Sequence, residues 1–176
     1  DIFPGAGSGV LAESLFALPT EKLLLFAAND GVGGTELWRS DGTEAGTVLV
    51  ADLTPGAPGS MVEYLPAAAN GALYFTTRDD TGGSVVWKSD GTGAGTRALR
   101  TLQAGAPGDG LPNAFSFTAL GNQVFFLGHE AGHGYELWKT DGTPEGTVRV
   151  GELRPGPASG VPATVGPGQL LALEDV

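Results

Sequence analysis

One short segment of the chain carries the residue types of a zinc-peptidase motif. His129-Glu130-Ala131-Gly132-His133 contains both histidines of the chain and matches the His-Glu-x-x-His pattern. In such enzymes a helix places the two imidazoles one turn apart, with the glutamate beside a metal-bound water. Three glycines in and around the segment, Gly128, Gly132 and Gly134, disfavour a helix. We therefore expect a hairpin here, with a zinc-dependent peptidase as the less favoured alternative.

Three Asp-Gly-Thr sequences offer a second kind of chemistry, because each places a carboxylate next to a hydroxyl. Their aspartates, Asp41, Asp90 and Asp141, are candidate calcium ligands. The structural alternative is a turn in which the carboxylate accepts backbone N–H bonds, the glycine adopts a positive φ angle and the threonine adds hydroxyl bonds. None of the three sequences has the spacing of an EF-hand loop. We favour turn chemistry and keep calcium as the alternative.

Acidic residues also recur in a second group of glycine-rich loops, at one position of the repeat described below. If these loops meet on one rim of the molecule, their carboxylates form a candidate site for cations or basic partners. The structural alternative is a set of solvated loop charges without a ligand. The candidate binding residues of this rim are Asp30, Asp79, Asp80, His129, Glu130 and His133.

The three tryptophans allow two interpretations. Their aromatic faces suit stacking on sugars, but Trp38, Trp87 and Trp138 stand at the same position of each copy of the repeat. A large aromatic residue placed identically in successive units more often fills the space between neighbouring sheets. We expect these side chains to belong to the core.

The elements that position all these residues belong to an internal repeat of about 50 residues. Glu36-Leu37-Trp38-Arg39-Ser40-Asp41-Gly42-Thr43 recurs at 85–92, where Val85-Val86 replaces Glu-Leu, and again at 136–143. A closing motif, Asp52-Leu53-Thr54-Pro55-Gly56, has counterparts at 101–105 and 152–156. The markers stay in register, so the chain contains about three and a half copies.

Each copy predicts four short strands, which in the first copy cover about 14–18, 23–28, 35–40 and 47–52. The second strand is densely apolar, as expected of a strand buried on both faces. The predicted fold class is all-β, a β-propeller-like array of about 3.5 four-stranded blades. We expect one repeat domain over 1–176, with copies at about 1–51, 52–100 and 101–151 and a partial copy at 152–176.

At the Glu-Leu-Trp-x-x-Asp-Gly-Thr core the chain resembles the ELWxxDGT-repeat proteins, a family of exported bacterial proteins in which the unit recurs many times. The resemblance covers nearly the whole chain, although the second copy departs from it at Val85-Val86. It implies a secreted or cell-surface binding and adhesion module, and it implies no particular reaction.

Composition narrows the set of partners. A net charge of −11 with only nine Lys and Arg residues argues against binding of nucleic acid. No run of 18 or more apolar residues exists, so we expect no membrane insertion. The absence of cysteine excludes disulfides and thiolate chemistry.

The fourth copy offers only two strand candidates, at 161–165 and 169–174. An incomplete blade leaves an open sheet edge. Either the chain is a fragment of a longer array, or two copies associate to complete a ring.

The sequence as a whole predicts a non-catalytic binding or adhesion module, secreted or on a bacterial cell surface, with a glycan or protein ligand at one rim. It requires no cofactor, and calcium is the only one it suggests. A structural spacer or assembly segment of a larger repeat protein is the alternative function.

Overall fold

The structure, a computed structural model, describes residues 2, 9–10, 14–18, 20–54, 62–78, 83–102 and 114–153, with 62–65 described in backbone only. Within these ranges every regular element is a β-strand, so the predicted all-β class is confirmed. The described part of the chain contains no helix that is long and apolar enough to cross a membrane.

The strands form three antiparallel sheets of four strands each, and in every sheet the strands are adjacent in chain order. The first sheet contains β1 (Phe16–Leu18), β2 (Leu23–Asn29), β3 (Thr35–Ser40) and β4 (Val48–Ala51). The second sheet contains β5 (Val62–Ala69), β6 (Ala72–Arg78), β7 (Ser84–Ser89) and β8 (Arg97–Leu102). The third sheet contains β9 (Ala114–Leu120), β10 (Gln123–Glu130), β11 (Gly134–Thr140) and β12 (Val148–Arg149).

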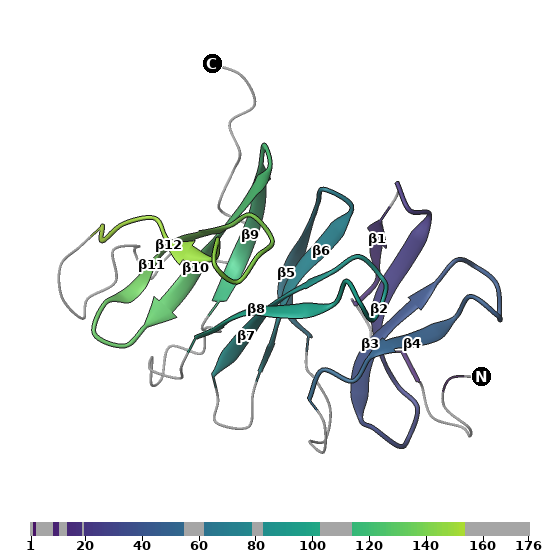
Figure 1. The fold of residues 1–176 in the computed structure, drawn as a ribbon. Coiled ribbons are helices and arrows are strands. Elements are labelled where there is room, and N and C mark those ends of the chain that lie inside the picture. Colours follow the sequence, from purple (N-terminus) through teal and green to yellow (C-terminus); the bar gives the residue numbers. More distant parts are fainter. Residues whose placement is uncertain are drawn as a thin grey trace.

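One sheet therefore corresponds to one copy of the repeat, and the four strands predicted for the first copy differ from the observed ones only at their ends. The three sheets stand side by side in a row (Figure 1). The first strands of neighbouring sheets lie closest to each other, with β5 against β9 and β1 against β5 and β6. None of the three sheets closes on itself, and the strands predicted for the fourth copy lie outside the described residues.

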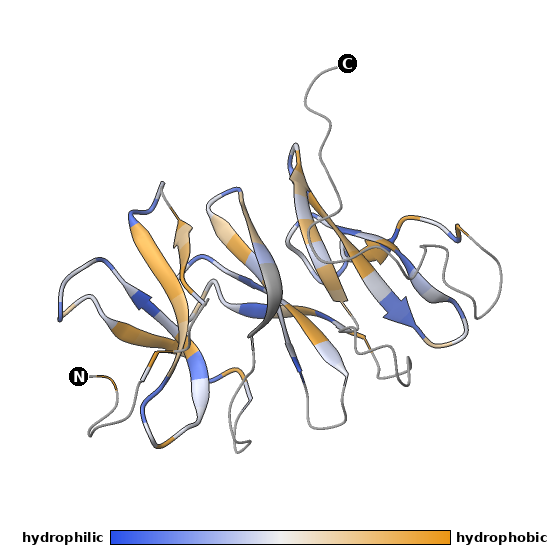
Figure 2. Cartoon of the chain, turned by 180° about the vertical axis from the view of Figure 1, so that it is seen from behind, coloured by the Kyte–Doolittle hydropathy of each residue, from blue (hydrophilic) through white to orange (hydrophobic). Residues whose placement is uncertain are grey.

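The second strand of the first and second sheets is the most deeply buried strand of its sheet, as the sequence predicts, and in the third sheet β10 and β11 are both largely buried. In β6 the first six residues are all buried. The strands themselves contain many apolar residues in all three sheets, while the turns are mostly polar (Figure 2). β6 lies in the middle sheet, with a sheet on either side, so both of its faces are buried, because successive side chains point in opposite directions.

Among the described residues, two core clusters lie between sheets, one in each gap. Leu25 and Leu37 of the first sheet meet Leu73 and Phe75 of the second. In the other gap the second sheet contributes a different set of side chains. These are Ala72, Tyr74, Val86, Leu99 and Leu102, which pack on Phe117, Val124, Phe126 and Trp138 of the third sheet. Burial of each large apolar side chain is worth about 1.5–3 kcal/mol, so stacking holds the sheets together.

Candidate functional site

The two ends of the sheets differ in chemistry, and we name them by their connections. The turn end carries the Asp-Gly-Thr turns, which join the third and fourth strands of each sheet. The hairpin end, at the opposite ends of these strands, carries the β2–β3, β6–β7 and β10–β11 connections.

At the turn end, each Asp-Gly-Thr turn is closed by the aspartate. Asp41 Oδ1 accepts the Thr43 backbone N–H at 2.9 Å and the Thr43 hydroxyl at 2.7 Å. The Thr43 hydroxyl oxygen in turn accepts the Gly46 N–H at 2.9 Å. The turns at Asp90 and Asp141 contain the same bonds. The predicted turn chemistry is thereby confirmed.

Two glycines in each turn have separate roles. Gly42 adopts a φ angle of 91°, as do its counterparts with similar values, which is the left-handed conformation that the turn needs. Gly46 is needed for space, since a Cβ there would lie 1.9 Å from Asp41 Oδ1. The aspartate therefore folds directly over the second glycine.

The same bonds favour the ionised aspartates. The Thr43 hydroxyl, followed by the Thr43 backbone N–H, holds the pKa of Asp41 below its usual value of 3.8. The Thr143 hydroxyl acts in the same way on the pKa of Asp141, and the Thr92 hydroxyl on the pKa of Asp90.

The calcium hypothesis for Asp41, Asp90 and Asp141 stays a prediction. Oδ1 of each carboxylate is already used inside its own turn. In the described ranges, no three acidic or histidine side chains come together as a metal site would require. The three aspartates belong to three different sheets.

A groove of about 480 Å³ lies at the turn end between the first and second sheets. Its lining carries both signs of charge, with Glu21 and Asp90 opposed by Lys88 and Arg97. Four of its lining residues, Lys88, Asp90, Thr92 and Gly95, belong to the turn motif of the second copy, and the others come from the first sheet, the β5–β6 turn and the strands beside it.

At the hairpin end, the His-Glu-x-x-His segment forms the β10–β11 hairpin, as the copy alignment predicts. His129 and Glu130 are the last residues of β10, where they pair with Tyr135 and Gly134 of β11. The His133 N–H closes the turn on the Glu130 carbonyl at 3.0 Å. The helix that a zinc-peptidase site needs is therefore absent from this segment.

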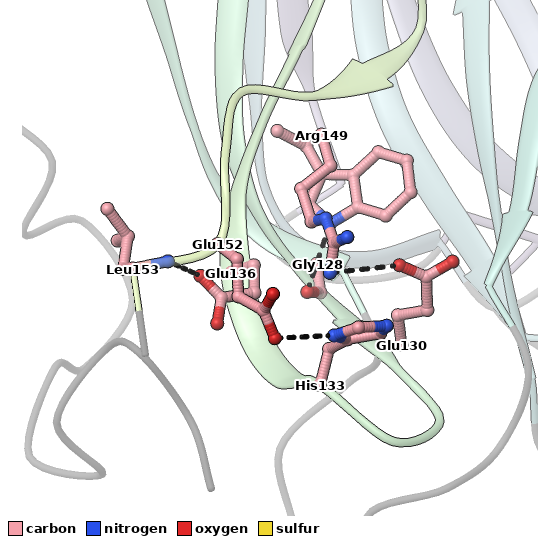
Figure 3. A network of polar contacts seen from close by, with 8 residues as sticks. Gly128, Glu130, His133, Glu136, Arg149, Glu152 and Leu153 are labelled. Carbon is pink, nitrogen blue, oxygen red and sulfur yellow. Dashed lines mark hydrogen bonds and ion pairs between the residues drawn. The ribbon is translucent and has the colours of Figure 1, made fainter. Parts of the chain in front are cut away.

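The three polar residues of that segment have different surroundings, and Figure 3 shows those of Glu130 and His133. His133 Nδ1 lies 3.0 Å from Glu152 Oε1. Glu130 Oε2 lies 3.6 Å from Arg149 Nη1. His129 is buried and packs edge-on against the Tyr135 ring, 5.1 Å away. The residues thus lie on one hairpin without converging on a common point.

A cavity of about 300 Å³ adjoins this hairpin and the end of β8. His129, Glu130 and Ala131 line one side, and Arg100 and Thr101 line the other. The Arg100 guanidinium also lies 5.2 Å from the centre of the Trp138 ring, which fixes it beside the cavity. The cavity thus has Glu130 of the third sheet and Arg100 of the second among its lining residues. The His129 ring packs on Tyr135, on the other face of the hairpin from Trp138.

The acidic rim is present only in part. Asp30 and Glu130 both lie at the hairpin end, Asp30 directly after β2 of the first sheet and Glu130 as the last residue of β10 of the third. Asp30 Oδ1 accepts the N–H groups of Val32 and Gly33 at 2.8 and 3.1 Å, and these bonds hold the pKa of Asp30 below 3.8. Asp79 and Asp80 lie outside the described residues.

Trp87 and Trp138 are placed as predicted for core residues, whereas the prediction is wrong for Trp38, which belongs to neither core cluster. Trp87 packs against the core between the first and second sheets, and Trp138 is part of the core between the second and third. Their indole N–H groups donate to equivalent positions, the Thr77 hydroxyl at 2.8 Å and the Gly128 carbonyl at 3.2 Å. Trp38, in the first sheet, is only half-buried.

In the first and third sheets a buried glutamate side chain binds the backbone just after the fourth strand. The sequence analysis missed this contact, which we call the glutamate latch. Glu36 Oε2 accepts the Leu53 N–H at 2.7 Å, and Glu136 Oε2 accepts the Leu153 N–H at 2.9 Å. In the second sheet Val85 replaces the glutamate, and there β8 continues to Leu102 by backbone pairing instead. The equal spacing of glutamate and leucine in two copies is the signal that could have revealed this latch.

No protein-family model, curated protein or solved structure matches the chain. The resemblance to the ELWxxDGT-repeat proteins therefore stays a prediction from the motif residues.

Proposed function

We propose that the chain is a non-catalytic binding and adhesion module, extracellular or on a bacterial cell surface, built as a β-propeller-like array. Its ligand binds at the hairpin end. The propeller-like arrangement is supported by three equivalent four-stranded sheets that stand in a row with their first strands adjacent.

The observation that carries the proposal is a contrast between two parts of the repeat. The Asp-Gly-Thr turns are constant from copy to copy, whereas the hairpins change. The turn motif makes the same hydrogen bonds in all three sheets. The hairpin sequences, in contrast, differ in every copy, from 29–33 through 78–82 to 129–133. Loops that vary on a rigid scaffold are typical of binding proteins.

The cavity beside the β10–β11 hairpin suggests the ligand class. Arg100 supplies donors, Glu130 supplies acceptors, and Leu102 and Ala131 add apolar lining next to them. The cavity, of about 300 Å³, is at the lower limit of small-ligand pockets. A hydroxyl-rich ligand makes use of all three groups, so a glycan is favoured over a protein segment.

A glycan array with the purified full chain tests this assignment. Arg100→Ala is expected to weaken binding of any glycan found by about tenfold or more, because among the described residues that line the cavity only Arg100 carries a guanidinium. Arg97→Ala is the matched control, since Arg97 is an exposed arginine of the same strand that lines the groove at the turn end. It is expected to bind as wild type does.

Two results would count against the proposal. One is a chain that binds neither glycans nor the surface of the cells that produce it. The other is a loss of binding that is equal for Arg97→Ala and Arg100→Ala. Fractionation of the producing cells tests the proposed location separately.

The alternative function is a structural or assembly segment with no ligand of its own. It is favoured by the use of Trp87, Trp138 and the Asp-Gly-Thr turns in contacts that hold the sheets together. The mass of the native protein discriminates, because a spacer belongs to a much longer polypeptide with many more copies.

A further inference from the structure

Each internal contact between sheets uses the end of the fourth strand of the earlier sheet. Leu53, just after β4, is 6% exposed and packs in the core with Leu73 and Phe75 of the second sheet. Leu102, at the end of β8, is 3% exposed and packs with the third sheet. These two leucines occupy the same position of the repeat.

The third sheet presents the same position to solvent. Leu153, the counterpart of Leu53 and Leu102, is 59% exposed. Val150 is 48% exposed, whereas its counterpart Leu99 is 4% exposed. Phe125 and Leu137 are also less buried than their counterparts in the other sheets. We call this surface, made of Phe125, Leu137, Val150 and Leu153, the tail face.

A basic side chain adds a polar contact to each internal interface. Arg39, which follows Trp38, donates from Nη1 to the carbonyl of Gly91, in the turn of the second sheet, at 3.1 Å. Lys88, its counterpart, lies against the turn of the third sheet, because a Cβ on Gly142 would come within 2.7 Å of Lys88 Nζ. Lys139 is the next residue of this series, and it borders the tail face.

The first sheet presents the complementary surface. A Cβ on Gly91 or Gly142 would meet side chains of the preceding sheet, but a Cβ on Gly42 would meet nothing within 4 Å. In Figure 1 the turn of the first sheet points away from the row, whereas the turns of the other two reach over the preceding sheet.

Apolar side chains on the same side of the first sheet are also incompletely covered. Leu49 is 45% exposed, and Trp38 is half-buried whereas Trp138 is buried. We call the surface of Trp38, Leu49 and the Gly42 turn the head face. It carries Asp41, whose carboxylate is ionised and suits an approaching lysine.

We propose that the tail face of one copy of this chain binds the head face of a second copy, repeating the internal contact between sheets. Leu153 and Val150 pack on the first sheet of the second copy, and Lys139 donates to the turn at Gly42. The two faces differ, so the association is head to tail and can continue to further copies or close into a ring. It does not depend on the proposed ligand.

Sedimentation velocity of the full chain over a range of concentrations tests the proposal. The wild-type chain is expected to associate, and Leu153→Asp in the tail face is expected to weaken association by about tenfold or more. The Leu153 backbone N–H that binds Glu136 is retained in this variant. Leu49→Asp in the head face is expected to weaken association equally.

A mixture of the two variants gives the sharpest readout. Each variant alone is expected to be monomeric, but together they form a dimer, because one supplies an intact head face and the other an intact tail face. Val32→Asp is the matched control, since Val32 is an apolar residue that is 92% exposed at the hairpin end. It is expected to associate as wild type does.

Three outcomes would overturn the proposal. They are a wild-type chain that is monomeric at about 100 µM, a Leu49→Asp variant that associates normally, and a mixture that shows no dimer. A monomeric wild-type chain would mean that residues after 153 of the same copy, and not a second copy, cover the tail face. Circular dichroism checks that each variant is folded, and Lys139→Glu provides a second tail-face variant.

Discussion

At the turn end of this molecule the same hydrogen bonds recur in all three sheets, whereas at the hairpin end the described hairpins, those of the first and third sheets, have different bonds. Asp41, Asp90 and Asp141 close identical turns. At the hairpin end, Asp30 caps backbone N–H groups of its own loop, while Glu130 reaches Arg149 of β12. The turn end thus repeats one set of hydrogen bonds in all three sheets.

The difference teaches which residues remain available for a ligand. At the turn end, the aspartate, threonine and second glycine are all needed to fold the turn, and the basic residue of the motif contacts the next sheet. At the hairpin end, a cavity lies between β8 and the β10–β11 hairpin. Substitutions at the two ends should therefore separate stability from binding.

The largest expected effect is that of Gly95→Ala at the turn end. A Cβ on Gly95 would lie 2.1 Å from the Asp90 carboxylate, so the turn must open and lose its internal hydrogen bonds. We expect a loss of about 2–3 kcal/mol in the free energy of unfolding, measured with urea. Gly132→Ala at the hairpin end is the control, since a Cβ there meets nothing within 4 Å and only the φ angle of 86° is unfavourable.

For Gly132→Ala we expect a loss of about 1 kcal/mol, from the left-handed conformation alone. Equal losses for the two alanine variants would show that the turn end is not the more constrained of the two.

A smaller effect is expected when Glu36, the latch residue of the first sheet, is replaced by valine, the residue that the second sheet has at this position. Glu36→Val removes the acceptor of the Leu53 N–H, and β4 ends at Ala51, too early to supply another by backbone pairing. We expect a loss of about 1–2 kcal/mol and faster hydrogen exchange at the Leu53 amide. Glu36→Gln keeps an acceptor oxygen and should lose less. An unchanged Leu53 exchange rate in Glu36→Val would contradict the latch.

The turn aspartates also predict a dependence of stability on pH. Hydrogen bonds to Thr43, Thr92 and Thr143 hold the pKa values of the three aspartates below 3.8 in the folded chain. The stabilisation is therefore fully present above pH 3.8 and is lost as the pH falls below it, through the lowered values. Asp41→Asn, Asp90→Asn and Asp141→Asn combined should flatten the acid limb of the stability profile. An acid limb as steep as that of the wild type would contradict this assignment.

Local chemistry explains what could be predicted from the sequence. Strand patterns, the Asp-Gly-Thr turns and the hairpin at His129 depend on residues within a few positions of one another. Gly132, with its φ angle of 86°, illustrates why the hairpin was predictable, because glycine there favours a turn over a helix.

Contacts between distant positions explain what could not be predicted. The Glu36–Leu53 bond spans 17 residues, and the position of Arg100 over Trp138 depends on how two sheets stack. The cavity beside His129 arises only from that stacking. A repeat alone indicates that sheets are equivalent, without indicating which side chains meet between them.

The smallest effect on stability is expected from substitutions in the hairpins themselves. Val32→Asp and Ala131→Asp both change exposed side chains, so each should alter the free energy of unfolding by no more than about 0.5 kcal/mol. Their effects on binding should differ, because Ala131 lines the cavity beside His129 and Val32 does not. Ala131→Asp adds a negative charge next to Glu130 and should weaken glycan binding, whereas Val32→Asp should leave it unchanged. If both variants bound like wild type, the ligand would have to bind elsewhere than in this cavity.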